Sequence, residues 1–573
     1  MKKTRFKLVA LAAIVLSVAT LISCSDDDPT AVAPVITGPS SWTRDKEALA
    51  SAAAAYPHWQ RLSSSFSFLV ESATASTISF EGPDSDPGPL VSLFQTDVNN
   101  WYPTKIFNYL YVSISDANRT VAQADSSFAN ENLSQATIDL ARGRALFIRG
   151  LAYLYLVELW GEVPLILTAN NPSTAEQTTR QPIEKVYTQI IKDLTEAEAL
   201  LPAYEQTHSN PSKGAANAIL ARAYLQWASK PLSQSEVAAI ALAKNDPAAP
   251  SWDSEKLQNA VAYANKVINS GNYSLEPNFA DLWGVKAENR SAEHIFTIHH
   301  DGDDLGDLQG NHQTHCPFTE RFDLYVDNHI GPSDVTLVDR FSDSDTRKKW
   351  SIITSLYNID EEIGSADPDV IENYKRYEFI FPVTSPRISK YIHRSPKFPE
   401  AAYSTEGEQP NNINRIEIRY AEVLLIKAEA LLNLGRAGEA LTPVNQLRQR
   451  AGLSNLSALT QDALENEWYL ELFFEQKEWL NLTRWRKLVS SVLTEVPQYE
   501  YYKSDYASVA TIIAAKGPEN DGTNGTKTNY PFFAKIYKHL HSKTDRVSGK
   551  FYRFPIPKGL SGNDLGIEQN PGY

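Results

Sequence analysis

Apolar and small residues recur at spacings of three and four along several segments, which is the pattern of helices that bury one face. The clearest run covers residues 138–156, and a second covers residues 182–202, with proline at both of its ends. A third begins after Ser212, whose hydroxyl suits a helix N-cap, and a fourth ends at Gly271. The pattern therefore predicts several amphipathic helices in the first half of the chain.

Two further helical runs, residues 421–432 and 440–447, are separated by a short stretch that contains Gly435. A connection this short favours antiparallel packing of the two helices as a hairpin. Residues 428–441 resemble a tetratricopeptide unit, in which small facing residues let two helices approach closely. Pro443 fits poorly inside the second helix, and we expect it to bend the start of that helix.

Three segments have a different character, because they are rich in proline, glycine, asparagine, aspartate and aromatic residues. They are residues 76–105, 273–410 and 495–573, and they include short strand-like pieces such as His294–Ile298. We interpret them as long structured insertions on a helical scaffold. Long ordered loops are where binding sites are usually found.

The N-terminal segment predicts export. Basic residues from Lys2 to Lys7 precede an apolar stretch, Leu8–Ile22, that is too short to span a bilayer comfortably and has the form of a signal peptide. Leu21–Cys24 resembles a bacterial lipobox, in which cleavage before Cys24 leaves a thiol that carries lipid. The acidic stretch Ser25–Asp28 then begins a flexible tether. An ordinary secretory signal with an incidental cysteine is the alternative.

The overall charge limits the class of ligand. The chain has 54 basic and 69 acidic residues, a net charge of −15. All charged residues of the proposed signal peptide are basic, so its removal would make the net charge more negative. Such an acidic balance argues against nucleic acid or an anionic glycan as the main ligand. Local basic residues could still bind an acidic group of a ligand, and the candidates are Arg321, Arg347 and Lys348.

Five passages together resemble the SusD/RagB family of outer-membrane nutrient-binding lipoproteins, and they follow the family's order along the chain. They are the lipobox with its acidic tail; Arg142–Tyr153 continuing to Trp160–Leu165; Ile418–Ala430, which we place in the helical hairpin; Glu471–Glu475 with Trp479–Trp485; and Phe554–Pro557 with Gln569–Tyr573. The sequence departs from the family at Glu467–Tyr469, where two arginines are usual, and at Gly143 and Gly150, where stronger helix formers are common.

The resemblance implies an all-α fold, with four tetratricopeptide-like helix pairs as scaffold and long irregular insertions that carry the binding surface. It also implies a SusC-like TonB-dependent transporter as partner, to which the protein presents captured oligosaccharide at the cell surface of the outer membrane. Chemistry in such systems belongs to separate enzymes. We therefore expect no catalytic residue and no cofactor. Nucleic acid is not expected as a partner.

The same resemblance sets the expected organisation of the chain. We expect a signal peptide over residues 1–23, a lipidated tether over residues 24–40, and a single domain over residues 41–573. The scaffold would lie mainly in residues 41–75, 105–272 and 415–490, and the ligand-side insertions mainly in residues 76–104, 273–410 and 495–550.

A site for neutral sugar needs exposed aromatic rings beside directional polar groups. Asp97–Tyr102 meets that need, is expected to be a loop, and corresponds to a loop that commonly contacts ligand in the family. The alternative is that Trp101 packs this loop onto the scaffold. Trp160, Trp479 and Trp485 lie in scaffold motifs and are expected to be buried. The candidate ligand-binding residues are Asn99, Asn100, Trp101, Tyr102, Trp283, Tyr325 and Trp350.

Histidines and aspartates cluster between His294 and Cys316, but without a recognised metal-ligand spacing. We interpret this stretch as a polar loop, with a sugar-contacting histidine or aspartate as an alternative, and predict no metal site.

The remaining alternatives concern function. The chain contains no His-Glu-x-x-His, Gly-x-Ser-x-Gly, phosphate-binding or dinucleotide motif. Paired carboxylates of a glycoside hydrolase are not recognisable from sequence spacing. Glycan binding is therefore the favoured hypothesis, and a peptide-binding member of the family, a transporter scaffold without its own ligand, and a hydrolase are the alternatives.

Overall fold

Helices dominate the part of the chain that the computed structural model describes, which is residues 41–78, 88–169, 179–282, 291–299, 334–335, 340–353, 387–388, 414–498, 540–558 and 567–573. The α-helices of the first half are α2 (Asp45–Ala53), α3 (Pro57–Ser72), α4 (Gly88–Ser92), α5 (Trp101–Ser126), α6 (Gln135–Trp160), α8 (Ile183–Leu200), α9 (Lys213–Ala228), α10 (Gln234–Ile240) and α11 (Ser254–Asn269).

The second half adds shorter elements. Its α-helices are α12 (Lys348–Ser351), α16 (Tyr420–Asn433), α17 (Ala437–Arg450), α18 (Gln461–Leu472), α19 (Glu478–Trp485) and α20 (Leu488–Glu495). Short 3₁₀ turns are η1 (Phe279–Leu282), η4 (Val496–Gln498) and η5 (Gly549–Tyr552). The strands are β1 (Thr77–Ile78), β2 (His294–Ile298), β3 (Asp334–Val335), β4 (Ile352–Ile353), β5 (Arg387–Ile388) and β6 (Arg415–Arg419).

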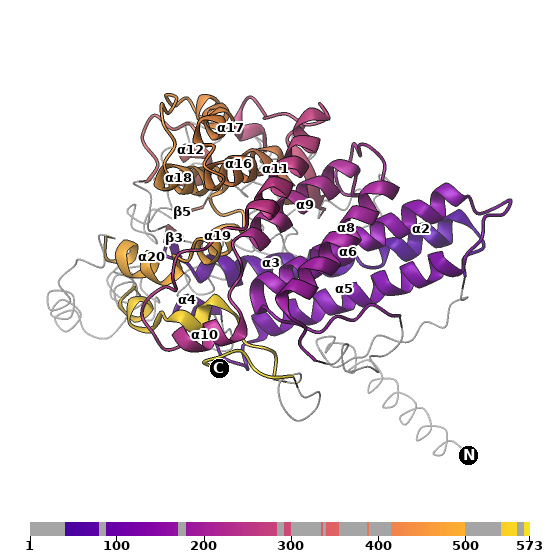
Figure 1. The fold of residues 1–573 in the computed structure, drawn as a ribbon, viewed down its shortest axis with the longest axis horizontal. Coiled ribbons are helices and arrows are strands. Elements are labelled where there is room, and N and C mark those ends of the chain that lie inside the picture. The colour runs from indigo at the N-terminus through magenta and orange to yellow at the C-terminus, as the bar shows by residue number, and fades with distance from the viewer. Residues whose placement is uncertain are drawn as a thin grey trace, which may run out of the picture. The chain divides into compact units, whose positions relative to one another are not determined.

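The helices pack against one another in a series (Figure 1). Helix α6 lies between α5 and α8, α9 contacts both α8 and α11, and α11 in turn contacts α16, which pairs with α17. Their inward faces share one buried apolar cluster that runs from α3 to α20. Residues Ser41–Tyr573 form one compact unit. The structure thus confirms the mainly helical fold and the α16–α17 pair that the sequence pattern predicts.

Two glycines on α6 explain how closely this helix approaches α8. A Cβ atom on Gly143 would lie 2.9 Å from the Cβ atom of Leu200, and one on Gly150 would lie 2.8 Å from the Cγ atom of Leu194. Stronger helix formers at these positions would push α8 away from α6. The departure from the family pattern at these two glycines is therefore a packing requirement.

The helix ends follow the predicted signals. Ser212 caps α9 by accepting a hydrogen bond from the backbone N–H of Ala215, at 3.2 Å. Gly271 and Gly435 follow α11 and α16 with φ angles of +70° and +75°, a conformation that glycine adopts without steric cost. Pro443 lies inside α17 and is buried.

The sequence interpretation was wrong at the start of α16, where it placed Ile418 and Arg419 in the helical hairpin. These residues belong to β6, which pairs antiparallel with β2 from His294↔Arg419 to Ile298↔Arg415. Arg415, Glu417 and Arg419 alternate with two isoleucines, as a strand requires, but all five residues are buried. The polar side chains of β6 are buried instead of facing solvent, because they form ion pairs inside the fold.

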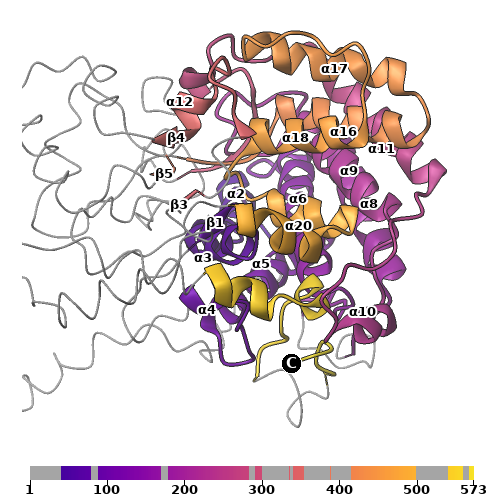
Figure 2. The same ribbon diagram turned by 90° about the vertical axis from the view of Figure 1, so that its left-hand side faces the viewer.

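The C-terminal motif packs against the end of α6. The indole N–H of Trp160 donates to the carbonyl oxygen of Pro555 at 2.9 Å. Asn570 Nδ2 donates to the carbonyl oxygen of Phe554 at 2.7 Å and to that of Trp160 at 3.2 Å. The last residues of the chain are therefore part of the scaffold, and they lie near α10 and α4 (Figure 2).

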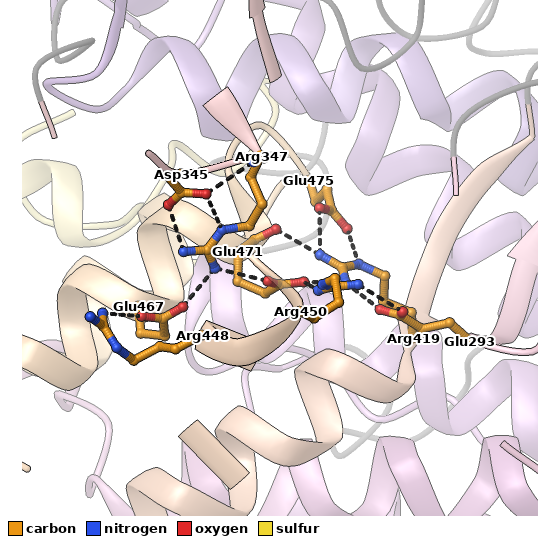
Figure 3. A network of polar contacts seen from close by, with 9 residues as sticks. All are labelled: Glu293, Asp345, Arg347, Arg419, Arg448, Arg450, Glu467, Glu471 and Glu475. Atoms are coloured by element: carbon orange, nitrogen blue, oxygen red, sulfur yellow. Dashed lines mark hydrogen bonds and ion pairs between the residues drawn. The ribbon is translucent and has the colours of Figure 1, made fainter. Parts of the chain in front are cut away.

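A buried ionic network joins α18 to sequence-distant parts of the fold (Figure 3). Glu471 accepts from Arg347 at 3.0 Å, from Arg419 at 2.6 Å, and from Arg450. Burial alone would raise the pKa of Glu471, but these three arginines hold it well below its usual value. The arginines come from the segment before α12, from β6 and from α17. This carboxylate therefore connects three segments that are not neighbours in sequence.

We predict that Glu471→Gln lowers the free energy of unfolding by about 3–5 kcal/mol, because it leaves three buried arginines short of one negative charge. Chemical denaturation followed by circular dichroism measures this loss. The matched control is Glu439→Gln, which removes the carboxylate of the exposed Arg436–Glu439 pair on α17 and should change stability far less. Equal effects of the two substitutions would contradict the structural role of Glu471.

Candidate functional site

The turn that precedes α5 holds its residues in place through local hydrogen bonds. Asn100 caps the helix, since its Oδ1 atom accepts from the backbone N–H of Tyr102 at 3.0 Å. Just before this cap in the sequence, Asp97 Oδ1 accepts from the backbone N–H of Asn99 at 2.8 Å. The carbonyl oxygen of Asp97 also accepts from the backbone N–H of Asn100, at 3.2 Å. The turn is therefore a fixed base for the side chains that project from it.

Trp101 is the exposed aromatic side chain of this turn, with 40% of its surface accessible. Its indole stacks on the ring of Tyr102, with centroids 3.9 Å apart and an interplanar angle of 22°. The amine of Lys105, one helical turn further on, lies 5.3 Å from the centroid of the indole. Tyr102 is buried, so it fixes the orientation of Trp101. An oriented, exposed indole beside polar groups can stack on the C–H face of a sugar ring.

Residues of the C-terminal segment lie next to this turn. Phe94, just before the turn, packs edge-to-face on Phe551, with centroids 4.8 Å apart. The amine of Lys550 lies 4.5 Å from the ring centroid of Tyr573, the last residue of the chain. Burial lowers the pKa of Lys550, and the nearby carboxylate of Asp97 opposes that shift. Sequence analysis missed these neighbours because they lie more than 400 residues away in the chain.

Two buried ionisable groups, Lys543 and Glu478, interact electrostatically with each other. Lys543 donates to the carbonyl oxygen of Ser72 at 3.0 Å, and its amine lies 5.7 Å from the ring centroid of Phe94. Burial lowers the pKa of Lys543 to about 7. Glu478, at the start of α19, accepts a hydrogen bond from Ser76, and burial raises its pKa to about 7. Desolvation dominates both groups, so the neutral form of each is favoured more in the fold than in water.

The structure brings four of the seven candidate ligand-binding residues together. Trp101 is the first residue of α5 and not part of a loop as expected, because Asn100 already caps the helix. Asn99 and Trp101 are exposed, whereas Asn100 and Tyr102 are buried. Trp283 and Tyr325 lie outside the described residues. Only the backbone of Trp350 is described, within α12.

Other expectations concern tryptophans and cations. Trp160, Trp479 and Trp485 are buried, as their positions in the scaffold motifs predict. Arg347, a candidate for binding an acidic ligand group, is fully buried and paired with Asp345 and two glutamates, so it is not accessible. Lys348 pairs with Asp343 at 2.6 Å. Arg321 lies outside the described residues.

The described ranges were also searched for metal ligands and for membrane spans. Within them, no three His, Cys, Asp or Glu side chains are grouped to hold a metal ion. His294 and His299 are buried, and residues 300–316 lie outside the described part of the chain. None of the helices in the described ranges combines the length and apolar character needed to cross a bilayer.

Comparison with known families assigns the chain. Residues 262–573 match the family described as the SusD family, and residues 85–225 match one described as starch-binding and associating with the outer membrane. The first match covers more than half of the sequence. The protein therefore belongs to the SusD family.

Characterised relatives agree with this assignment. The SusD-like protein P2 of Formosa agariphila is 27% identical over 412 residues, which cover 69% of this chain and 74% of the relative. The starch-binding protein SusD of Bacteroides thetaiotaomicron is 22% identical over 486 residues, or 77% of this chain and 74% of that protein.

Solved structures share the fold. A SusD superfamily protein from Parabacteroides distasonis superposes with a TM-score of 0.65 at 22% identity, covering 93% of this chain and all of that one. A laminarin-binding SusD-like protein gives a TM-score of 0.63 at 20% identity, with the same coverage. Surface glycan-binding protein A from Bacteroides thetaiotaomicron, in complex with laminarihexaose, gives 0.62 at 17% identity, again with this coverage.

We predict that Asn100→Ala destabilises the protein by about 1 kcal/mol, because the first turn of α5 loses its capping acceptor. Asn100→Asp keeps an acceptor at the same place and should retain most of that stability. Thermal unfolding of the three proteins measures the difference. An Asn100→Ala protein as stable as the parent would show that the cap does not hold the turn.

A second prediction concerns pH. The pKa of Glu478 is raised from 4.5 to about 7, so its contribution to stability is complete below pH 4.5 and is lost as pH rises through about 7. Lys543 is charged in both folded and unfolded states below pH 7, and so adds little slope there. Between pH 5 and pH 7, the unfolding free energy of the parent should therefore fall by on the order of 1–2 kcal/mol more than that of Glu478→Gln.

Chemical denaturation at both pH values, for the parent and for Glu478→Gln, measures this difference. Titrating groups that do not interact with Glu478 contribute equally to both proteins and cancel in the comparison, whereas the pKa of Lys543, which Glu478 raises, should fall further in Glu478→Gln. Identical pH slopes for the two proteins would contradict a raised pKa for Glu478.

Proposed function

We propose that this protein is a non-catalytic, lipid-anchored glycan-binding protein of the bacterial cell surface. It would capture a neutral oligosaccharide or polysaccharide and deliver it to a SusC-like TonB-dependent transporter in the outer membrane. Cys24 would carry the lipid. The proposal goes beyond family membership, and it rests on the site, on the N-terminal sequence and on what the relatives bind.

The exposed Trp101 is the observation that carries the proposal. Trp101 leaves 40% of its surface accessible at a capped helix end, and stacking on Tyr102 fixes the orientation of its ring. Asn99 is exposed beside it, and Lys105 lies close to the ring. The turn therefore offers an apolar face with hydrogen-bonding groups at its edge, which are the two features that a sugar ring requires.

The buried partners assign different roles within the turn. In this proposal Trp101 and Asn99 touch the ligand, whereas Asn100 and Tyr102 hold the indole in position. Asn100 is occupied as the helix cap, and Tyr102 lies beneath the indole. Trp283, Tyr325 and Trp350 remain proposed contacts from the central insertion.

The relatives support a carbohydrate ligand and the cell-surface setting. One matching family is described as starch-binding and associating with the outer membrane, and two proteins of the same fold bind laminarin or laminarihexaose. The net charge of −15 favours a neutral glycan. The lipobox-like Leu21–Cys24 and the acidic residues after it support export and anchoring.

Native affinity electrophoresis of the full chain in mild detergent, against a panel of neutral polysaccharides, tests the proposal. We expect retardation by at least one polysaccharide, and an affinity about tenfold weaker for Trp101→Ala, a loss of about 1.4 kcal/mol. The control is Phe128→Ala, which removes an 80% exposed aromatic ring just beyond the other end of α5 and should bind normally.

The outcomes separate the hypotheses. Retardation that survives Trp101→Ala would move the site to the central insertion. Failure of every polysaccharide to retard the protein would contradict the glycan proposal and favour a peptide ligand or a scaffold role. Release of reducing sugar during incubation would contradict a non-catalytic role.

A further inference from the structure

A pocket of about 440 Å³ lies among α18, α19 and α20. None of its described lining residues belongs to the turn that carries Trp101. We call it the α18–α20 pocket. Its volume lies within the range of small-molecule sites, roughly 300–1,000 Å³. The pocket is partly open and is lined by both aromatic and polar side chains. Nothing in the proposed function uses it.

Four aromatic side chains contribute to the lining of the α18–α20 pocket: Trp468, Tyr469, Phe473 and Trp485. Their orientations are fixed by neighbours. The indole N–H of Trp485 donates to Glu429 Oε1 at 2.9 Å, and the Tyr469 and Phe473 rings pack edge-to-face with centroids 5.4 Å apart. The guanidinium of Arg340 lies 4.5 Å from the centroid of Tyr469. The aromatic rings are therefore preorganised in the wall of the pocket, where each exposes at most 8% of its surface.

The charged side chains of the lining are already neutralised by partners. Arg340 pairs with Glu495 at 2.7 Å, and Lys487 pairs with Glu465 at 2.7 Å and with Asp462 at 3.5 Å.

The two remaining ionisable groups of the lining are also held within the fold. Lys477 pairs with Glu422 at 3.2 Å, and Glu478, whose pKa burial raises to about 7, is hydrogen-bonded by Ser76. A charged ligand would have to compete with these pairs, whereas a neutral ligand leaves them intact. The electrostatics of the pocket thus favour an uncharged molecule.

Neutral polar groups complete the lining. Asn466 and Asn481 provide amides, and Ser490 and Thr494 provide hydroxyl groups. Trp468 is buried, and its indole N–H has no acceptor among the residues that the structure describes. A buried donor without an acceptor is costly, and a ligand oxygen would remove that cost.

Trp468 and Tyr469 directly follow Glu467 on α18. Glu467 binds Arg347 in the buried network, at 2.6 Å. This stretch therefore supplies both an anchor for the fold and two rings for the pocket.

We propose that the α18–α20 pocket is a second carbohydrate site, which binds one or two neutral sugar residues between its aromatic side chains and its amides. The class of ligand rests on the proposed function, but the site is separate from the Trp101 turn. Apolar C–H faces would contact the rings, and hydroxyl groups would bond the amides and the indole N–H of Trp468.

Saturation-transfer NMR with five neutral disaccharides tests this site: laminaribiose, cellobiose, maltose, xylobiose and mannobiose. The protein is the full chain in mild detergent carrying Trp101→Ala, which removes the platform of the first site. We expect at least one disaccharide to show saturation transfer. Adding Asn466→Trp should fill the pocket and reduce that signal at least fivefold. Adding Trp468→Phe should weaken it while the aromatic ring is kept.

The matched control is Gln446→Trp, which places the same side chain on an exposed position of α17 outside the pocket lining and should leave the signal unchanged. Circular dichroism confirms that each variant is folded. No transfer from any of the five disaccharides, or transfer that survives Asn466→Trp, would overturn the second site. Failure of the proposed function is seen separately, as absence of polysaccharide retardation in the protein with Trp101 intact.

Discussion

Glu471 receives ionic contacts from three arginines, and the fold of the second half of the chain depends on this buried carboxylate. Arg419 belongs to β6, Arg450 to α17 and Arg347 to the segment before α12. The network extends to four arginines and five carboxylates (Figure 3). Buried ion pairs contribute little net stability compared with apolar packing, but breaking one leaves a costly unpaired charge. The network therefore selects one arrangement of these segments over others.

That arrangement also positions the binding surface. Segment 340–353 lies within the central insertion, and Arg347 holds it against α18 through Glu467 and Glu471. Arg340 of the same segment lies at the edge of the α18–α20 pocket. In the first half of the chain, Phe94, just before the Trp101 turn, packs on Phe551 of the C-terminal segment. Both proposed sugar sites thus rest on contacts between segments far apart in sequence, which gives rigid surfaces and not mobile loops.

The helices could be predicted from sequence because their signals are local. Ser212 and Gly271 mark helix ends by their own hydrogen bonding and φ angle, and the family motifs gave the correct fold. Strand β6 was missed because the ion partners that allow Arg415, Glu417 and Arg419 to be buried come from other segments. The support of Trp101 was missed for the same reason. A pattern along one segment shows periodicity, but it does not show which distant charge or ring meets it.

The account as a whole makes Trp101 and its turn the place where a glycan is captured. Hydrogen–deuterium exchange of the full chain in mild detergent, with and without a polysaccharide that retards it, tests this claim directly. The account predicts slower exchange in peptides that cover residues 95–105 when the polysaccharide is present, and no change around the exposed Phe128. Unchanged exchange over residues 95–105, with protection elsewhere, would contradict the claim that this turn contacts the ligand.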